Sequence, residues 1–505
     1  MRPAPIREKV GRKGVHGRRR SLEIGLDLGT SSVIGLLCEA GRPRAEARRT
    51  LTTASPTPYA SEQTPEDWWQ AARAVLAELI APLPEAKRQS IRAIALSGQM
   101  HGAVLLDAAG AVLRPAMLWN DGRAHAECAA LQEALPGIGT LAGVPPLPGF
   151  TAPKLLWLAR HEPEIHARIA HVLLPKDYLG LRLHGGYATD PSDAAGTLWF
   201  DQAERRWSEA LCAASATDPD WLPPVLEGAQ VAGEILPQMA AELGLSPKVQ
   251  IVTGGGDAAT GAVAVGAVED GTGLISLGTS GQFLLAGSAY RPNPGAFVHA
   301  FAHTLPERWY QMAAMLNGAR PIAWFAGVSG AEIGALLQEA AEVPETRVPL
   351  FLPYLTGERS PHGDPHIRGG FFGLEDSTSR AAMMRAVVEA VAFCFADAVR
   401  SFGPAAQGLA PLPALGGGAQ SDLLLQSVAD ASGLSLFRPE SATSGPSLGT
   451  AKLAALATGA LSRSDLARRP EAREIFGPRP TAALQDRLEA WRALYRVLKP
   501  LAVPR

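Results

Sequence analysis

The chain has 505 residues, of which 47% are hydrophobic, and its formal net charge is −2. Because a single hydrophobic core stops growing beyond roughly 250–300 residues, this length predicts two domains. The nearly balanced charge argues against a nucleic-acid-binding protein, which usually carries a basic excess. No stretch of the sequence approaches the ~18 consecutive apolar residues that a membrane-spanning helix needs.

The cysteines and histidines do not form a metal-binding pattern. The four cysteines are scattered and contain no CxxC pair; they are Cys38, Cys128, Cys212 and Cys394. This spacing fits neither a disulfide framework nor a zinc site, so a reducing, cytoplasmic location is expected. His362 and His366 lie close together without a third ligand at a suitable spacing, which predicts a polar loop and not a metal site.

The first 20 residues carry eight Lys or Arg side chains against Glu8 alone. A secretory signal would continue into a longer apolar stretch, whereas here the apolar stretch is short and leads straight to Asp27. A run of like charge is expected to be disordered, so residues 1–20 are interpreted as a basic, disordered extension. A tail that binds nucleic acid or a membrane, and an over-long start assignment, are the alternatives.

The first predicted element is a β-hairpin. Apolar residues alternate with small or acidic ones from Leu22 to Leu28, and a second apolar run, Val33 to Cys38, follows a turn of small residues at 29–32. Residues 64–67 then read Thr-Pro-Glu-Asp. They predict the start of a helix, with Thr64 at the N-cap and Asp67 at the reciprocal capping position.

Later elements alternate between strand and helix. Ile91 to Leu96 predicts a strand that runs into the loop Ser97–Gly102. Ala381 to Ala396 predicts a buried helix, and Leu484 to Leu498 predicts an amphipathic closing helix. Strands that alternate with helices predict an α/β fold.

Two short motifs recur in the same order in each half of the chain. Asp27-Leu28-Gly29-Thr30-Ser31 recurs as Ser276-Leu277-Gly278-Thr279-Ser280, and Gly254-Gly255-Gly256-Asp257 recurs as Gly416-Gly417-Gly418-Ala419. One such pair of common residue types could arise by chance. Two pairs in matching order favour a duplication, and therefore two domains of related fold that face each other across a cleft.

These turns have the composition of a phosphate-binding site. Glycine has no Cβ, so the backbone N–H groups of a glycine turn can approach an anion closely. Hydroxyl donors in the first motif pair come from Thr30, Ser31, Thr279 and Ser280. Acids occur only in the first copies, as Asp27 and Asp257. The first domain is therefore expected to carry out the chemistry and the second to hold a nucleotide.

Phosphoryl transfer needs a metal–nucleotide complex, an aligned acceptor hydroxyl and a base that takes its proton. Asp27, at the phosphate hairpin, suits Mg²⁺, because this ion prefers oxygen ligands and keeps its waters. Asp257 suits the general base. A helix N-cap role for Asp257 stays open from these residues alone.

At this point the chain resembles the FGGY carbohydrate kinases of the actin–hexokinase–heat-shock-protein superfamily, from about Leu22 to its end. The resemblance is carried by six motifs, at residues 97–102, 118–123, 149–157, 174–178, 192–197 and 354–362. The loop Ser-Gly-Gln-Met-His-Gly at 97–102 is similar to the xylulokinase branch and differs from the Asn-Gln-Arg-Glu of glycerol kinases. The resemblance implies two ribonuclease-H-like domains of the actin/hexokinase type, at 21–266 and 267–505, and ATP-dependent phosphorylation of D-xylulose.

The resemblance also implies a role for each matching residue. Asp257 would be the base, and Asp27 would serve the metal and the phosphates. The sugar would contact Gln99, Met100, His101, Trp119 and Asp257. ATP would contact Gly29, Thr30, Ser31, Gly278, Thr279, Gly416, Gly417, Gly418, Gln420 and Ser421. ATP and Mg²⁺ are the implied cofactors, a small sugar is the implied ligand, and a homodimer is expected by resemblance.

Some positions depart from the family pattern. Ala258 stands where an asparagine that can bind the sugar is common, which keeps open a kinase for another ketose or an alditol, such as ribulose or arabinitol. Ser32 and Ile34 replace a glycine and a lysine, and Ser447 and Thr450 replace alanines. A non-catalytic sensor or a chaperone-like ATPase is the third alternative. The retained Asp27 and Asp257 argue against the sensor, and the 97–102 loop argues against the chaperone.

Overall fold

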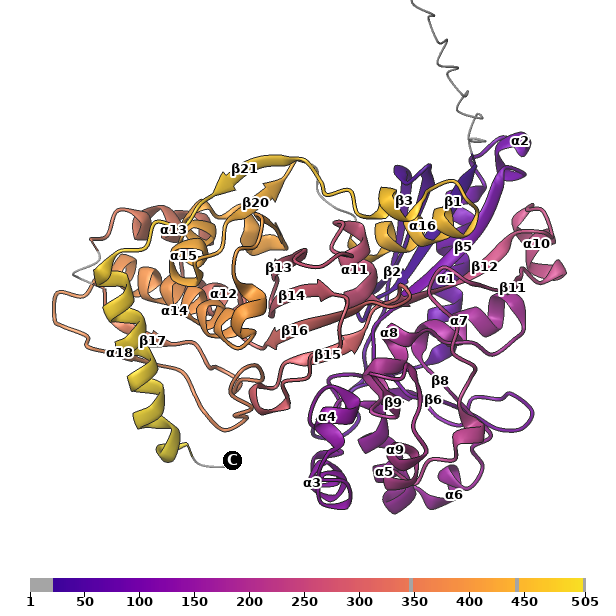
Figure 1. The fold of residues 1–505 in the computed structure, drawn as a ribbon, viewed down its shortest axis with the longest axis horizontal. Coiled ribbons are helices and arrows are strands. Elements are labelled where there is room, and N and C mark those ends of the chain that lie inside the picture. Colours follow the sequence, from indigo (N-terminus) through magenta and orange to yellow (C-terminus); the bar gives the residue numbers. More distant parts are fainter. Residues whose placement is uncertain (1–20, 345–347, 441–444, 503–505) are drawn as a thin grey trace, which may run out of the picture.

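The computed structural model describes residues 21–344, 348–440 and 445–502, which form two lobes, each built on a mixed sheet (Figure 1). The basic segment 1–20 lies outside the described residues. Within the described ranges, no helix is both long and apolar enough to cross a membrane.

The first sheet contains the predicted hairpin. β1 and β2 pair antiparallel, while β1, β5 and β12 run parallel to one another. Every residue of β1 is buried, which fits its position in the middle of the sheet. In spatial order the strands are β3 (Arg42–Thr50), β2 (Ser32–Glu39), β1 (Leu22–Leu28), β5 (Ile91–Gly98), β12 (Gln250–Gly256) and β11 (Val231–Glu234).

Helices cover both faces of this sheet. Leu37 of β2 packs in the same apolar cluster as residues of α1 (Pro65–Ile80), whereas its neighbour Leu36 packs against Ala451 of α16 (Gly445–Ala457), because successive strand residues point to opposite faces. Thr64 does precede α1, but its side chain makes no capping hydrogen bond, so the predicted capping box is wrong. The helices that follow the strands of this lobe are α1 (Pro65–Ile80), α2 (Glu85–Arg88), α7 (Pro175–His184), α10 (Pro237–Leu243) and α11 (Asp257–Ala264).

A largely helical region is inserted between β5 and β12 and lies at the bottom of the first lobe in Figure 1. Its core continues into the second sheet, since Leu155 and Trp199 share one apolar cluster with Phe301. The inserted region therefore helps to join the two lobes. Its elements are β6 (Val104–Leu106), β7 (Ala116–Met117), α3 (His125–Ala134), α4 (Ile138–Ala142), α5 (Thr151–His161), α6 (Pro163–His166), β8 (His171–Leu173), α8 (Pro191–Ala194), η1 (Ala195–Thr197), β9 (Phe200–Asp201), β10 (Arg206–Trp207) and α9 (Glu209–Ala214).

The second sheet repeats the strand arrangement of the first. β13 and β14 form an antiparallel hairpin, and β19 lies parallel to β13 as β5 lies parallel to β1. This matching topology agrees with the predicted duplication. In spatial order the strands are β15 (His299–Ala302), β16 (Trp309–Met315), β14 (Gly281–Gly287), β13 (Gly273–Leu277), β19 (Leu412–Leu415), β20 (Leu436–Pro439) and β21 (Ala472–Phe476).

One part of the predicted repeat is wrong. Residues 254–256 end β12, which is two strands away from β1, whereas residues 416–419 follow β19, which directly neighbours β13. The counterpart of the second triple-glycine turn is therefore the 97–102 loop at the end of β5. The two glycine runs look alike because both need close backbone approach, and not because they occupy equivalent places.

The helices of the second lobe include the two that were predicted. α14 is almost entirely buried, and α18 buries an apolar stripe that includes Leu488 and Trp491. The elements between and after the strands are α12 (Arg320–Ser329), α13 (Ile333–Ala341), β17 (Leu350–Leu352), β18 (Gly370–Phe372), α14 (Arg380–Arg400), α15 (Asp422–Ser432), α16 (Gly445–Ala457), α17 (Arg463–Leu466) and α18 (Ala482–Leu498).

α16 crosses back to the first lobe, where Figure 1 shows it over β1 and β5. A Cβ on Gly25 of β1 would lie 2.1 Å from the Ser447 carbonyl oxygen, and one on Gly449 would lie 1.7 Å from that of Thr260 in α11. Glycine is required at both contacts because the backbones touch. The domain boundary at residue 266 stays a prediction. Residues 445–457 come after this boundary in the sequence but pack on the first lobe.

Candidate functional site

Three parallel strands bring the predicted acids to one edge of the first sheet. In the register of the sheet, Asp27 of β1 lies opposite Ser97 of β5, which in turn lies opposite Gly255 of β12. Asp257 follows β12 and is the first residue of α11. In open α/β sheets, ligands bind where parallel strands reach their carboxyl ends, so this edge is the first place to look for a site.

Asp257 lines a cavity of about 280 Å³ between the lobes, together with Ser276, Gln282 and Gly416 of the second lobe. Burial raises the pKa of Asp257 to about 6, although the N–H of Ala258 donates a hydrogen bond that favours the carboxylate. The side chain is only half-buried and opens into the cavity. A carboxylate with this pKa is largely ionised at neutral pH and can still accept a proton.

Asp27 has the environment of a cation ligand. Its pKa is raised to about 7, first by burial and then by the negative charge of Asp257. Its Oδ1 atom is buried and has no hydrogen-bond partner among the described residues. The same part of the chain contains no group of three or more His, Cys, Asp or Glu side chains that could hold a metal. A cation at Asp27 would therefore take most of its ligands from water or from a bound substrate.

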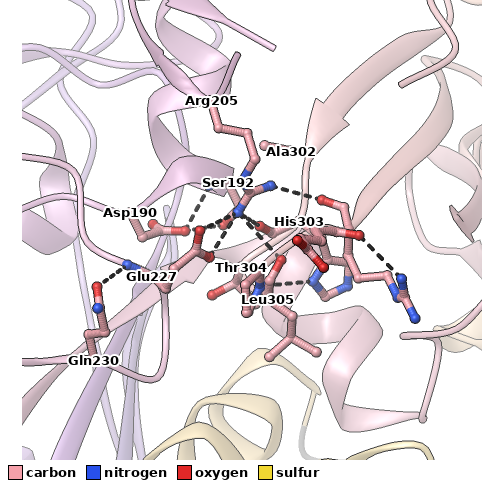
Figure 2. A network of polar contacts seen from close by, with 12 residues as sticks. Asp190, Ser192, Arg205, Glu227, Gln230, Ala302, His303, Thr304 and Leu305 are labelled. Carbon is pink, nitrogen blue, oxygen red and sulfur yellow. Dashed lines mark hydrogen bonds and ion pairs between the residues drawn. The ribbon is translucent and has the colours of Figure 1, made fainter. Parts of the chain in front are cut away.

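The turn before Asp257 is fixed from both lobes, through Ser192 and Thr304, which are labelled in Figure 2. The Ser192 hydroxyl accepts the N–H of Gly256 at 3.0 Å and donates to Asp190 at 2.5 Å. From the second lobe, Thr304 donates its hydroxyl to the carbonyl of Gly254 at 2.6 Å. These bonds hold the backbone on either side of Gly255 and so set the direction in which Asp257 points.

Gly254 itself can only be glycine. Its φ is +78°, and a Cβ would lie 1.6 Å from the carbonyl oxygen of Leu96.

Arg205 binds the turn between β15 and β16, which carries Thr304, to the first lobe (Figure 2). Its Nη2 donates to both carboxylate oxygens of Glu227, at 2.8 and 2.9 Å. Its Nη1 donates to the carbonyl of Arg308, at the other end of the β15–β16 turn, at 2.9 Å. Thr304 is thereby held against the turn before Asp257.

A buried charge cluster supports Ser192 from behind. The Lys176 ammonium group lies 2.5 Å from Asp177, 3.1 Å from Asp190 and 3.6 Å from Asp193. These carboxylates raise the pKa of Lys176 against the effect of burial, so the lysine stays charged. Burial raises the pKa of Asp193 well above its usual value. The cluster gives Asp190, and through it Ser192, a fixed position.

His101 is held in an unusual conformation beside this turn. Its φ is +72°, which is uncommon for a residue other than glycine. Its carbonyl accepts hydrogen bonds from Lys154 at 2.8 Å and from Thr151 at 3.2 Å, and its ring lies 4.2 Å from that of Phe150. The residues of the 149–157 motif therefore hold the backbone and the ring of His101 in place.

The imidazole of His101 is neutral and has a defined tautomer. Burial lowers its pKa to about 3. Its Nδ1 lies 2.6 Å from the carbonyl oxygen of Gly196, so Nδ1 carries the proton and donates it. Nε2 is then a hydrogen-bond acceptor, and no described residue occupies it.

The other residues predicted to bind the sugar have different surroundings. Met100 packs against Gly256, where a Cβ would lie 3.0 Å from its Sδ atom. Gln99 is buried, accepts the hydroxyl of Thr30 at 2.8 Å and donates to Gln63 at 3.1 Å, so both ends of its amide are occupied. Trp119 is partly exposed, and its Nε1 donates to Thr30 at 2.9 Å. Gln99 and Trp119 therefore both hold the β1–β2 turn.

A second cavity, of about 760 Å³, lies in the second lobe and adjoins the first. Ser276 and Gly416 line the smaller cavity, while the next residues along the chain, Leu277 and Gly417, line the larger one. Of the residues predicted to bind ATP, the larger cavity is lined by Gly278, Thr279, Gly417, Gly418, Gln420 and Ser421. Gly29, Thr30 and Ser31 line neither cavity and lie at the β1–β2 turn.

Comparison with known protein families identifies the kind of protein that has this arrangement. The FGGY family of carbohydrate kinases matches through its N-terminal domain at residues 22–264 and through its C-terminal domain at residues 273–458. The chain belongs to this family. The resemblance seen in the motifs is thus confirmed, and so is the enzyme class, a carbohydrate kinase, which implies the use of ATP.

Individual relatives of this FGGY kinase cover almost the whole chain. The "Xylulose kinase" of Escherichia coli (strain K12) is 42% identical over 95% of this chain and 99% of that protein. The "Xylulose kinase" of Bacillus subtilis (strain 168) is 36% identical over 86% of this chain and 88% of that protein. A crystal structure described as a "xyloylose kinase" from Brucella ovis has a TM-score of 0.91 and 40% identity, covering 95% of this chain and 100% of that one.

Sequence reasoning missed part of both cavities of the kinase. The larger cavity is also lined by α12 and α13, through residues that include Ala323 and Leu337. These are ordinary apolar helix residues, and no local pattern marks them. Ser192, Gly196 and Lys154 lie in recognised motifs, so the signal was present, but their partners are distant in the sequence and only the fold reveals them.

Proposed function

We propose that this kinase transfers the terminal phosphoryl group of Mg-ATP to the terminal hydroxyl of D-xylulose, with Asp257 as the general base. The observation that carries the proposal is the position of Asp257, an ionisable carboxylate that opens into a cavity lined by both lobes. The curated relatives named as xylulose kinases, at 42% and 36% identity, support the choice of sugar.

The nucleotide is assigned to the larger cavity. Its walls include the apolar side chains Ile322, Ile333 and Leu337, which suit a flat aromatic base. Gly278 and Gly417 place backbone next to the passage into the smaller cavity, where phosphate groups can approach without a Cβ in the way. This orientation directs the terminal phosphate toward Asp257.

Asp27 is the residue that would hold Mg²⁺, because its buried Oδ1 atom has no other partner among the described residues. When bound, the ion neutralises charge on the phosphates during transfer. Asp27 itself would be ionised in that state. Burial and then the charge of Asp257 raise its pKa, so a cation bound there would favour the ionised form of Asp27.

Asp257 and His101 are both positioned from one short segment of the chain. Ser192 holds the turn of Asp257, and Gly196, four residues later, holds the imidazole of His101. The reacting end of the ketopentose is therefore assigned to Asp257 and its other end to Nε2 of His101. Asp257 would take the proton from that hydroxyl as the phosphoryl group arrives.

A second candidate substrate class rests on Ala258. Its methyl group lines the smaller cavity directly beside Asp257 and offers no hydrogen bond to a sugar hydroxyl. Another ketose, such as ribulose, or an alditol is therefore the alternative acceptor.

The cytoplasmic location and the homodimer stay predictions. Sedimentation of the purified protein tests whether it forms the homodimer that the resemblance implies.

The test is sugar-dependent ADP release by the purified protein across a panel of ketoses and alditols. We expect the highest kcat/KM with D-xylulose and a loss of about 10²–10⁴-fold in kcat for Asp257→Asn, because proton transfer by a positioned base contributes that much. Turnover with a different sugar alone would keep the mechanism and reject the substrate. No turnover with any sugar would reject the proposal.

A further inference from the structure

We propose that His299 and Arg359, both from the second lobe, bind the end of the sugar that lies away from Asp257, together with His101 of the first lobe. The inference rests on the proposed function and goes beyond it, because it assigns part of the sugar site to the nucleotide lobe.

His299 faces His101 across a phenylalanine ring. It is the first residue of β15, and its ring centroid lies 5.9 Å from that of Phe150, which in turn lies 4.2 Å from that of His101. The ring also stacks on Phe301 at 5.2 Å. Its Nδ1 atom is buried and has no hydrogen-bond partner among the described residues. A polar ring atom buried next to the sugar loop is thus left without a partner.

Arg359 is held beside this ring by its two neighbours in the chain. The Glu358 carboxylate accepts the N–H of Leu316, just after β16, at 2.6 Å. The Ser360 hydroxyl accepts the N–H of Ala314 at 3.1 Å and donates to the carbonyl of Phe297, two residues before His299, at 2.5 Å. The backbone at position 359 is therefore anchored over the β15–β16 pair.

The charge of Glu358 acts on the guanidinium group of Arg359, but no described residue forms a hydrogen bond with it. Its Nε atom is buried without an acceptor, and the described residues include no ion pair or hydrogen bond to its side-chain nitrogens. Burial lowers the pKa of Arg359. The hydrogen bond from Ser360 to Phe297 places Arg359 next to the segment that leads into His299, and the charge of Arg359 adds to burial in lowering the pKa of His299. The side chain is partly exposed, but its buried Nε donor is left unsatisfied, which is unfavourable unless a ligand accepts its hydrogen.

His101, His299 and Arg359 each have a side-chain nitrogen without a hydrogen-bond partner among the described residues, and together these nitrogens indicate one kind of ligand. Nε2 of His101 accepts hydrogen bonds, the guanidinium donates them, and Nδ1 of a neutral His299 does one or the other. A sugar offers hydroxyl groups that donate and accept, and a ketose adds a carbonyl oxygen that suits the guanidinium. A neutral polyhydroxylated ketone satisfies the set without burying a second charge. Because the groups come from both lobes, sugar binding would depend on contact between them.

The test compares Arg359→Gln and His299→Phe with the parent protein and with Arg368→Gln. Arg368 is a matched control in the same loop, since it is exposed and bonds only to the backbone carbonyls of Pro365 and Ile367. D-xylulose binding is measured by calorimetry without nucleotide, and KM values for sugar and ATP are measured separately. We expect Arg359→Gln to weaken D-xylulose binding and raise its KM at least tenfold, with KM for ATP within twofold and the thermal midpoint not lowered.

The outcomes separate the two proposals. Equal D-xylulose binding and KM in the parent and in both site variants would overturn the inference and leave the proposed function standing. A lower thermal midpoint with an unchanged sugar KM would mean that Arg359 is structural, which also overturns it. If the parent turns over a different sugar, the proposed substrate fails, and the same comparison is made with that sugar. Failure of the parent to bind or use any sugar would overturn both.

Discussion

Replacing Ser192 by alanine is expected to slow phosphoryl transfer more than it weakens substrate binding. The hydroxyl of Ser192 is completely buried, accepts the N–H of Gly256 and donates to Asp190. The variant leaves that N–H unsatisfied, which costs about 1–3 kcal/mol, and removes one bond to a charged carboxylate, which is worth about 1.5–3 kcal/mol. In the variant, Asp190 still accepts the backbone N–H of residue 192 and still pairs with the Lys176 ammonium group. These interactions offset part of the free energy lost with the hydroxyl bond.

The total loss is then about 2–4 kcal/mol, which is less than the ~5–15 kcal/mol that holds typical proteins folded. If about half of it appears in the transition state, where Asp257 must be aligned, kcat falls roughly five- to thirtyfold. KM for ATP should stay within twofold, since the larger cavity is not touched.

Steady-state ADP release and thermal unfolding measure the two effects together. Ser208→Ala is the matched control, because it removes a hydroxyl that caps α9 far from the site and should lower stability without changing kcat. A kcat for Ser192→Ala within twofold of the parent, at a lowered thermal midpoint, would refute the idea that this bond aligns the base.

Four further outcomes are expected. Because Asp257 must be ionised to accept a proton and its pKa is raised to about 6, log kcat/KM should rise with pH below about 6 and level off above it; a profile flat down to pH 5 would argue against this base. Asp27→Asn should raise the Mg²⁺ concentration for half-maximal activity at least tenfold, measured by titration at saturating ATP, and an unchanged Mg²⁺ requirement would remove Asp27 from the metal site. Lys154→Met removes the shorter of the two hydrogen bonds to the carbonyl of His101 and leaves the one from Thr151, so KM for the sugar should rise roughly two- to tenfold while KM for ATP holds, because one hydrogen bond contributes about 0.5–1.5 kcal/mol; an equal rise in both would indicate general disruption. Gly416→Ala places a Cβ 2.8 Å from the Leu277 backbone at a φ of +88°, so nucleotide affinity, measured by calorimetry, should fall and the thermal midpoint should drop, with Gly477→Ala, whose Cβ would meet open space, as the control.

Local patterns were sufficient for the elements and for the outline of the site. The alternation at 22–28 and the apolar stripe at 484–498 are each contained in a few neighbouring residues, and each has the structure that was predicted, whereas the three glycines predicted as a turn are the last residues of β12. Asp27 lies near the end of β1 and Asp257 directly follows β12, and these parallel strands bring both acids to one edge of the sheet, as an α/β alternation implies.

What the sequence did not reveal depends on contacts between distant segments. Thr304 and Arg205 hold the turn before Asp257 from positions that have no motif, and the place of Arg359 over β16 depends on a loop that packs across the sheet. The second glycine repeat was misread for the same reason, since strand order decides equivalence and composition does not. The capping hydrogen bond of Thr64 also failed to form, although the residue types at 64–67 allow it.

The path of the chain through α16 limits how this protein can be divided. The polypeptide passes from the first lobe to the second after α11, returns after β20 to form α16, and goes back again to form β21. A fragment that ended near residue 266 would lack Ala451 and Ala454, which fill the interior behind β2 and β5, and would leave that apolar surface open to water. A hybrid of two family members would need α16 to come from the same parent as the first lobe, with exchanges placed in the two later crossings as well as at the first.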